Sequence, residues 1–265
     1  MADEQPQFLD VGRGAARRRI AWLRQPPARV GGFGVFWLSG FMSDMVSTKA
    51  TALAEWAAEH GHACTRFDYS GHGQSEGRFA DGTIGCWLEE AEAAFTQLTK
   101  GPQIVVGSSM GGYIALLLLR RLLQRAPTVA ERLAALVLIA PAWDMTEELM
   151  WQRFAPSARA EIEAKGVFMR PSQYGDPYPI TRQLIEEGRN HLLARKTFDP
   201  GRPVRIMHGL QDPDVPWEHT LDLASFLDGG WTEVSAIPDG EHRLSRPEDL
   251  AMLCAILDEV AASVV

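Results

Sequence analysis

Gly107-Ser108-Ser109-Met110-Gly111 is the stretch of sequence that decides the fold. It lies between an apolar run, Gln103 to Val106, and a long apolar helical pattern from Gly112 to Gln124. A strand, a sharp turn that carries a serine, and then a helix form the context of a G-x-S-x-G nucleophile elbow, which lifts the serine hydroxyl above the sheet edge. A Cβ atom at either flanking glycine would clash with the neighbouring strand or helix. The pattern therefore predicts a nucleophile at Ser109, whereas a plain Ser/Gly turn that only links strand to helix is the alternative.

Strands and helices alternate on both sides of this elbow. Such alternation predicts an α/β fold, with a mostly parallel sheet, right-handed crossovers and flanking helices. The expected strands are 20–23, 35–38, 64–69, 104–106, 133–140, 203–208 and 232–237, and the expected helices are 48–60, 83–98, 112–124, 217–227 and 247–260.

The alternation stops between residues 142 and 200, where helical patches and large apolar residues occur without a strong strand signal. A segment of about 60 residues is too long for a plain loop. We predict a core of residues 1–141 and 201–265, with residues 142–200 inserted as a helical lid over the strand ends. A helical pair packed only for stability is the alternative. The candidates for contact with substrate are Trp143, Met145, Phe168 and Tyr174.

Composition excludes several functional classes. Of the 265 residues, 46% are hydrophobic, which suits one α/β domain with a sizeable core. The net charge is −8, and no basic stripe with interleaved aromatic residues is present, so we expect no nucleic-acid binding. No apolar stretch reaches the ~20 residues that span a bilayer, and the acidic N-terminus lacks a signal-peptide pattern. We expect a cytoplasmic protein without stable membrane anchoring; the sequence does not indicate its oligomeric state.

The three cysteines, Cys64, Cys86 and Cys254, fall in apolar segments far apart in the sequence. They share no metal-binding spacing and suggest no disulfide framework, so we interpret them as small core residues.

A serine hydroxyl is a weak nucleophile until a base takes its proton, and the base is usually a histidine oriented by a carboxylate. After an elbow of this kind the acid precedes the histidine, and each follows a strand. Asp212 follows the strand that ends near His208, and Asp214 is its rival, two residues further on. Of the seven histidines, only His242 follows the last predicted strand. Position therefore favours Asp212 as the acid and His242 as the base.

The tetrahedral intermediate of such a reaction needs two backbone N–H donors for its oxyanion. One should be the N–H of Met110, directly after the nucleophile and at the start of a helix, where the helix dipole also favours negative charge. The other should come from the loop after the 35–38 strand, where the Phe41 N–H fits.

The elbow, the acid and the histidine resemble those of the α/β-hydrolase superfamily. A narrower resemblance runs from about residue 33 to 260 and includes the segments Phe67 to Ser75, Gly101 to Ser109, Lys165 to Val167, Pro171 to Tyr174 and Val215 to Trp217. These segments look like the branch that holds the mitochondrial acyl-glucuronide esterase and protein depalmitoylase of animals and its bacterial relatives. The resemblance implies a serine esterase or thioesterase, with its catalytic residues at Ser109, Asp212 and His242 and its oxyanion donors at Phe41 and Met110.

These observations lead us to expect hydrolysis of a carboxylic ester or thioester through an acyl-enzyme on Ser109, with no cofactor and no metal. The expected partner is a small-molecule or lipidated substrate. A C–C bond hydrolase or a peptidase could use the same three residues, and a small-molecule receptor that has lost turnover is a further alternative. Dehalogenase and epoxide-hydrolase chemistry is disfavoured, because those enzymes carry a carboxylate at the position of Ser109.

Overall fold

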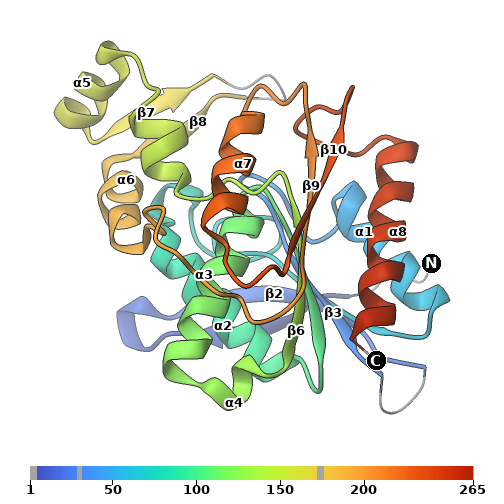
Figure 1. The fold of residues 1–265 in the computed structure, drawn as a ribbon. Coiled ribbons are helices and arrows are strands. Elements are labelled where there is room, and N and C mark those ends of the chain that lie inside the picture. Colours follow the sequence, from blue (N-terminus) through green and yellow to red (C-terminus); the bar gives the residue numbers. More distant parts are fainter. Residues whose placement is uncertain (1–4, 29–31, 172–175, 265) are drawn as a thin grey trace.

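The computed structural model describes residues 5–28, 32–171 and 176–264. Eight strands form one twisted sheet in the order β1-β2-β4-β3-β5-β6-β9-β10 (Figure 1). The strands from β4 to β10 in this order pair in parallel, whereas β1 and β2 join one edge antiparallel. The predicted α/β fold with a mostly parallel sheet is confirmed. The strands are β1 (Gln7–Val11), β2 (Arg18–Gln25), β3 (Gly34–Leu38), β4 (Ala63–Phe67), β5 (Gln103–Ser108), β6 (Leu133–Ile139), β9 (Val204–Gly209) and β10 (Thr232–Ile237).

Helices cover both faces of the sheet, as Figure 1 shows. In β5, Ile104 and Val106 point into the core formed with α1 and α8, while Val105 points into the opposite core formed with α2 and α3. This alternation follows from the two-residue repeat of a strand, and it explains why β5 is apolar at every core position. The helices of the core are α1 (Thr48–Glu59), α2 (Ile84–Leu98), α3 (Met110–Arg125), α4 (Pro127–Ala130), α7 (Trp217–Phe226) and α8 (Pro247–Ser263), with 3-10 turns at Gly14–Ala16 and Phe79–Asp81.

Strand β1 is absent from the prediction. Its apolar residues are interrupted by Asp10 and form too short a run to indicate a strand, and in the fold only Val11 is buried. It pairs with β2 at the edge of the sheet. The prediction that all three cysteines are core residues holds for Cys64, which is buried, but Cys86 and Cys254 are only partly buried.

The chain between β6 and β9, here called the insertion (residues 142–200), stands above the sheet at the upper left of Figure 1. The segment predicted as a helical lid contains helices but also two strands that the prediction lacks, because β7 (Val167–Arg170) and β8 (Tyr178–Thr181) pair antiparallel as a second small sheet. Strands of four residues are too short to show an alternating pattern, and Pro179 interrupts the second one. The helical parts are η3 (Thr146–Trp151, a π-helix), α5 (Pro156–Lys165), α6 (Arg182–Gly188) and η4 (Arg189–His191).

The base of the insertion is held by one buried carboxylate. Asp144, just after the insertion begins, accepts hydrogen bonds from the backbone N–H groups of Leu193 (2.7 Å) and Ala194 (2.8 Å), near its end. The two ends of the insertion are therefore joined where they leave the sheet.

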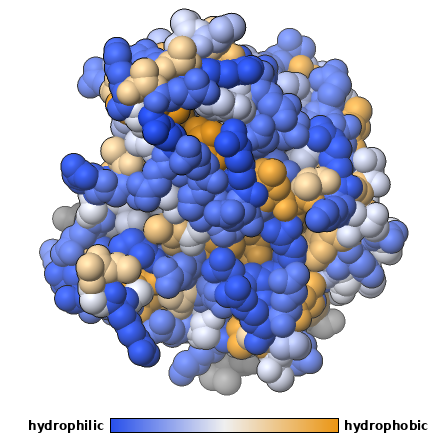
Figure 2. Space-filling model, turned by 90° about the vertical axis from the view of Figure 1, so that its left-hand side faces the viewer, coloured by the Kyte–Doolittle hydropathy of each residue, from blue (hydrophilic) through white to orange (hydrophobic). Residues whose placement is uncertain are grey.

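The face that carries α5 and α6 is mostly hydrophilic, and apolar side chains appear mainly in recesses between polar ones (Figure 2). Among the described residues, no helix has both the length and the apolar character required to cross a bilayer.

Candidate active site

Ser109 lies on a strained turn between β5 and α3. Its backbone is in the left-handed region (φ 54°), which a residue with a Cβ rarely adopts. The turn is fixed by hydrogen bonds on both sides: the Ser109 N–H donates to the Ile139 carbonyl (2.8 Å), and the Ser109 carbonyl accepts from the Ala142 N–H (3.1 Å). The start of the insertion is thereby tied directly to the turn.

The glycines of the elbow are required by close backbone contacts, as the sequence predicts. A Cβ at Gly107 would lie 2.3 Å from the Gly111 carbonyl oxygen, and one at Gly111 would lie 2.0 Å from the Leu38 carbonyl oxygen. Both distances are far inside van der Waals contact, so only glycine allows α3 to pack this closely against β3 and β5.

Asp212 lies in the loop after β9, with its side chain fully buried. One of its carboxylate oxygens, Oδ1, accepts from the backbone N–H groups of Asp214 and Val215, each at 2.9 Å. The other, Oδ2, is 2.7 Å from Nδ1 of His242. The carboxylate is therefore fixed by its own loop and aimed at the imidazole.

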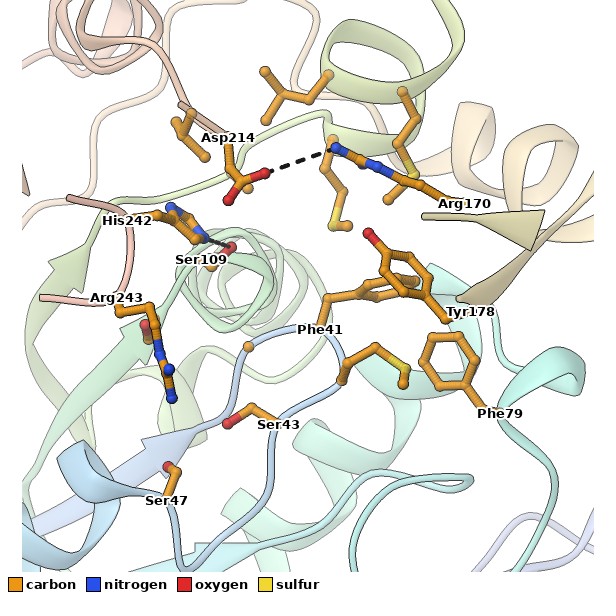
Figure 3. Close-up of a pocket in the computed structure, with 18 of the residues that line it drawn as sticks. Phe41, Ser43, Ser47, Phe79, Ser109, Arg170, Tyr178, Asp214, His242 and Arg243 are labelled. Carbon is orange, nitrogen blue, oxygen red and sulfur yellow. Dashed lines mark hydrogen bonds and ion pairs between the residues drawn. The ribbon is translucent and has the colours of Figure 1, made fainter. Parts of the chain in front are cut away.

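His242 follows β10 and links the carboxylate to the serine. Its Nε2 is 3.1 Å from the Ser109 Oγ (Figure 3). Because a carboxylate only accepts hydrogen bonds, the proton of the neutral imidazole lies on Nδ1, and Nε2 is left to accept from the Ser109 hydroxyl. The three side chains that sequence position favours thus form one continuous chain of hydrogen bonds.

Two glycines bring the acid loop and the histidine loop together. A Cβ at Gly209 would lie 2.3 Å from the Gly240 carbonyl oxygen, which itself accepts from the Gln211 N–H (2.9 Å). Because the loops touch backbone to backbone, Asp212 and His242 meet although 30 residues separate them.

Asp214, the rival acid, does not contact the imidazole in this way. Its carboxylate lies 3.7 Å from the Arg170 guanidinium, which comes from β7 of the insertion (Figure 3). Asp212, Asp214 and His242 offer ligand atoms within 4.8 Å of one another. However, a cation there would displace the proton on Nδ1 and compete with the contacts of both carboxylates, so the set fits a proton relay better than a metal site.

The predicted oxyanion donors lie on either side of Ser109. Phe41 follows β3 in a loop that passes beside the serine: a Cβ at Gly40 would be 3.5 Å from the Ser109 Cβ. Met110 is the first residue of α3. In the part of the chain that the structure describes, neither the Phe41 nor the Met110 N–H donates a hydrogen bond, so both are available to an oxyanion.

A cavity of about 720 Å³ opens above Ser109 and His242. Figure 3 shows aromatic rings on one side of the serine, where Phe41 packs against Phe79 (4.8 Å between ring centres) and Tyr178 (5.7 Å). We call this the aromatic side. On the other side, below His242 in the view, Arg243 points toward Ser43 and Ser47.

The residues predicted to contact substrate do not all line the cavity. Met145 lines the cavity, together with Leu149 and Met150 of the same segment. Trp143 does not: it is fully buried in the core, where its Nε1–H donates to the His219 carbonyl (2.7 Å). Phe168 does not line the cavity either, and it packs against Phe154. An apolar side chain alone does not distinguish a core position from a cavity wall, which is why these two predictions are wrong. Tyr174 lies outside the described residues.

Two of the other histidines, His208 and His191, lie away from the reacting groups. His208 is buried between the Val215 carbonyl (3.0 Å from Nε2) and the Thr220 hydroxyl (2.8 Å from Nδ1), and burial lowers its pKa, so it stays neutral. His191 of the insertion pairs with Glu187 (2.5 Å) and does not line the cavity.

Sequence reasoning missed most of the residues that line the cavity, among them Tyr178, Arg170, Lys49 and Arg243. Tyr178 stands between two prolines in a segment already assigned to the insertion. This position in the predicted lid was the one signal in the sequence that could have indicated a contact with the cavity. Arg170 and Arg243 carry no distinguishing pattern, because surface positions hold the same residue types, whereas Lys49 lies in the segment Thr48 to Ala50, which also resembles the branch named above.

Comparison with known proteins was made by sequence and by structure. The family described as "Serine aminopeptidase, S33" matches residues 35–187. The human protein "Palmitoyl-protein thioesterase ABHD10, mitochondrial" is 32% identical over 229 residues, which cover 86% of this chain and 72% of the human protein.

Among solved structures, the one described as "Putative hydrolase from Agrobacterium vitis S4" is 40% identical, with a TM-score of 0.93 over 97% of this chain and 98% of that chain. Mouse α/β-hydrolase domain-containing protein 10 is 30% identical, with a TM-score of 0.84 over 98% of this chain and all of that chain (100%). Both matches extend through the insertion as well as the sheet.

Proposed function

The chain belongs to the α/β-hydrolases, in the branch of the ABHD10-like hydrolases, and from this premise we propose that it is a serine hydrolase that cleaves carboxylic esters or thioesters. The observation that carries the proposal is the chain of hydrogen bonds from Asp212 through His242 to the Ser109 hydroxyl, at 2.7 and 3.1 Å. These distances lie within the range that proton transfer to a base requires.

In the proposed reaction His242 takes the Ser109 proton at Nε2 while Oγ attacks the carbonyl carbon of the substrate. Asp212 holds the imidazole in the required tautomer and stabilises the imidazolium that forms. The N–H groups of Phe41 and Met110 receive the negative charge that develops on the carbonyl oxygen. His242 then gives its proton to the leaving alcohol or thiol, and in the second half of the reaction it activates water to release the acyl group.

The walls of the cavity support an apolar acyl group. Apolar side chains line much of it, among them Phe41, Phe79, Met145, Leu149 and Tyr178. Burial of an acyl chain against them is favourable by about 0.8 kcal/mol for each CH₂ group removed from water. The human relative is named a palmitoyl-protein thioesterase, and we propose a related class of acyl substrate for this chain.

The test compares the native protein with Ser109→Ala on p-nitrophenyl esters and acyl thioesters of increasing chain length. We expect the variant to lose activity by a factor on the order of 10⁴ or more, because no other group can replace the nucleophile. Thermal melting of the variant should match that of the native protein. Full activity in Ser109→Ala would refute the assignment.

A peptidase that uses the same three residues is the second candidate, because the matching family is described as a serine aminopeptidase. An aminopeptidase must hold the protonated terminal amine of its substrate close to the nucleophile. Of the carboxylates that line the cavity, Asp214 is engaged by Arg170, and Asp176 is exposed. Aminoacyl amides in the substrate panel separate the two reactions: faster turnover of the amides than of the matched esters would favour the peptidase.

Covalent labelling of Ser109 distinguishes a hydrolase from a receptor without turnover. We expect a fluorophosphonate probe to label Ser109 in the native protein and not in Ser109→Ala. An unlabelled native protein that a small ligand nevertheless stabilises against heat would favour the receptor. The cytoplasm is the proposed location, and fractionation of the source cells tests it.

A further inference from the structure

His208 lies beside the carboxylate of Asp212, although it contacts neither Ser109 nor the cavity. It is the last residue but one of β9, and its Nε2 is 3.8 Å from Oδ2 of Asp212, with both side chains fully buried. This distance is too long for a hydrogen bond. Any effect of His208 on the reaction must therefore act through the position of Asp212, which itself exchanges no proton in the proposed mechanism.

The hydrogen bonds of His208 decide which of its nitrogens carries the proton. Nε2 is 3.0 Å from the Val215 carbonyl, which can only accept, so the ring proton lies on Nε2. Nδ1 is then an acceptor, and the Thr220 hydroxyl donates to it at 2.8 Å. Burial lowers the pKa of His208, although the nearby Asp212 carboxylate opposes the shift, and the ring stays neutral. With both nitrogens satisfied, the ring is held in one orientation.

Val215 connects this ring to the acid. Its carbonyl accepts from His208, and its N–H donates to Oδ1 of Asp212 at 2.9 Å. Val215 is buried and precedes Pro216, which restricts its backbone to extended conformations. A displacement of Val215 away from His208 would therefore also move its N–H away from the carboxylate.

The loop after β9 that carries Asp212 (residues 210–216) is held at both of its ends. At the β9 end, the N–H groups of Leu210 and Gln211 donate to the carbonyls of Ile237 and Gly240, each at 2.9 Å. At the other end, His208 ties Val215 back to the sheet. Asp212 lies between these two attachments, so the contact with His208 bears directly on where the carboxylate points.

We propose that His208 is a positioning residue of the proton relay, which keeps Val215 in place so that the Val215 N–H holds the Asp212 carboxylate toward His242. The inference rests on the proposed hydrolase function and deepens it. Asp212 must stay in line with Nδ1 of His242 to stabilise the imidazolium while Ser109 attacks. A misplacement of about 1 Å, even one caused far from the reacting atoms, can cost about 100-fold in rate. The alternative is a ring that only stabilises the fold.

Two substitutions divide the two hydrogen bonds of the ring between them. In His208→Gln the amide nitrogen reaches the position of Nε2 and can donate to Val215, but it offers no acceptor to Thr220. In His208→Asn the shorter amide reaches the position of Nδ1 and can accept from Thr220, but it offers no donor to Val215. On one p-nitrophenyl ester we expect kcat to fall by about 10- to 100-fold in His208→Asn, with KM within about twofold, and to stay within about threefold in His208→Gln.

Two further measurements report on the position of Asp212. The Nδ1 proton of His242 is held by a carboxylate at 2.7 Å, and a proton in so short and charge-assisted a bond resonates far downfield in NMR spectra. This signal should move upfield in His208→Asn and stay in place in His208→Gln. The acid limb of kcat/KM should move to lower pH in His208→Asn, because a displaced carboxylate stabilises the imidazolium less.

Leu98→Ala is the control for a general loss of stability. Leu98 is the buried last residue of α2, close to the start of β5 and therefore at the opposite end of that strand from Ser109. Removing its side chain destabilises the core without reaching Asp212, so kcat and the downfield signal should equal those of the native protein. His208→Leu also lacks the donor to Val215, and it must show the same changes as His208→Asn, including where the asparagine variant does not fold.

The outcomes separate the positioning role from the proposed reaction. Equal kcat values and equal signals in His208→Gln and in the variants without the donor would overturn the positioning role, because the contact with Val215 would then not matter. If the native protein hydrolyses no ester but the signal moves as expected, the positioning role stands and the proposed reaction falls. If turnover occurs and the signal stays in place in every variant, the positioning role falls alone.

Discussion

The proton chain at the active site depends on which of two neighbouring carboxylates faces the imidazole. Asp212 is buried, fixed by two backbone N–H groups and 2.7 Å from Nδ1 of His242. Asp214 is partly exposed and pairs with Arg170 instead. Substitution of Asp212 should therefore lower the rate of reaction far more than substitution of Asp214, although both residues lie in the same loop.

Asp212→Asn should lower kcat by about 10³- to 10⁴-fold. The asparagine amide would donate to Nδ1 and move the imidazole proton to Nε2, so that Nε2 could no longer accept from Ser109. Asp214→Asn is the matched control, and we expect it to stay within about threefold of the native rate. Steady-state kinetics on one p-nitrophenyl ester measures both, and a larger loss in Asp214→Asn than in Asp212→Asn would reverse the assignment.

At the scale of single elements, the elbow between β5 and α3 depends on the absence of a Cβ atom at two glycines. Gly107 and Gly111 leave room for backbone atoms that approach closer than any side chain allows. The same contacts place the Met110 N–H at the start of α3, beside Ser109. Stability and catalytic geometry are therefore set by the same two glycines.

Gly111→Ala should destabilise the protein by more than about 3 kcal/mol, since the new Cβ would meet the Leu38 carbonyl oxygen at 2.0 Å and force α3 away from β3. Gly32→Ala is the control, because among the described residues its Cβ would meet only the His62 ring, at an ordinary 3.6 Å. Urea unfolding measures the free energy of unfolding of both variants. Equal stabilities for the two variants would show that α3 can shift without cost.

At the scale of the whole molecule, buried neutral histidines make stability depend on pH. Burial lowers the pKa of His219 to about 4, and that of His72 likewise to about 4. The unfolded chain, where a histidine titrates near 6.5, then binds more protons than the folded chain between pH 6.5 and 4. The stabilisation is complete above pH 6.5 and is lost as the pH falls through this window.

For His219 the loss should amount to about 2 kcal/mol between pH 7.5 and pH 5, by the linkage of the two pKa values. His219→Gln can still donate to the Trp143 carbonyl, which His219 contacts through Nε2 (2.8 Å), but does not titrate. Chemical unfolding at both pH values should therefore show a smaller decrease in the variant. An unchanged decrease would place the acid sensitivity elsewhere in the molecule.

The sequence predicted what depends on the order of elements along the chain. Ser109, Asp212 and His242 each follow a strand of a parallel sheet, and the carboxyl ends of such strands meet at one edge, so their convergence was accessible from spacing alone. The short strands β7 and β8 could not be predicted from the sequence, because four residues show no reliable alternation. The burial of Trp143 and the cavity positions of Lys49 and Arg243 depend on packing between distant segments, which local pattern does not encode.

The contact between Ser109 and His242 joins residues 133 positions apart in the chain, across four neighbouring strands from β5 to β10. It forms only when β6 and β9 have docked between them in the correct order. Recovery of enzymatic activity after dilution from denaturant would therefore time the completion of the sheet, whereas far-ultraviolet circular dichroism would follow the earlier or simultaneous formation of the helices.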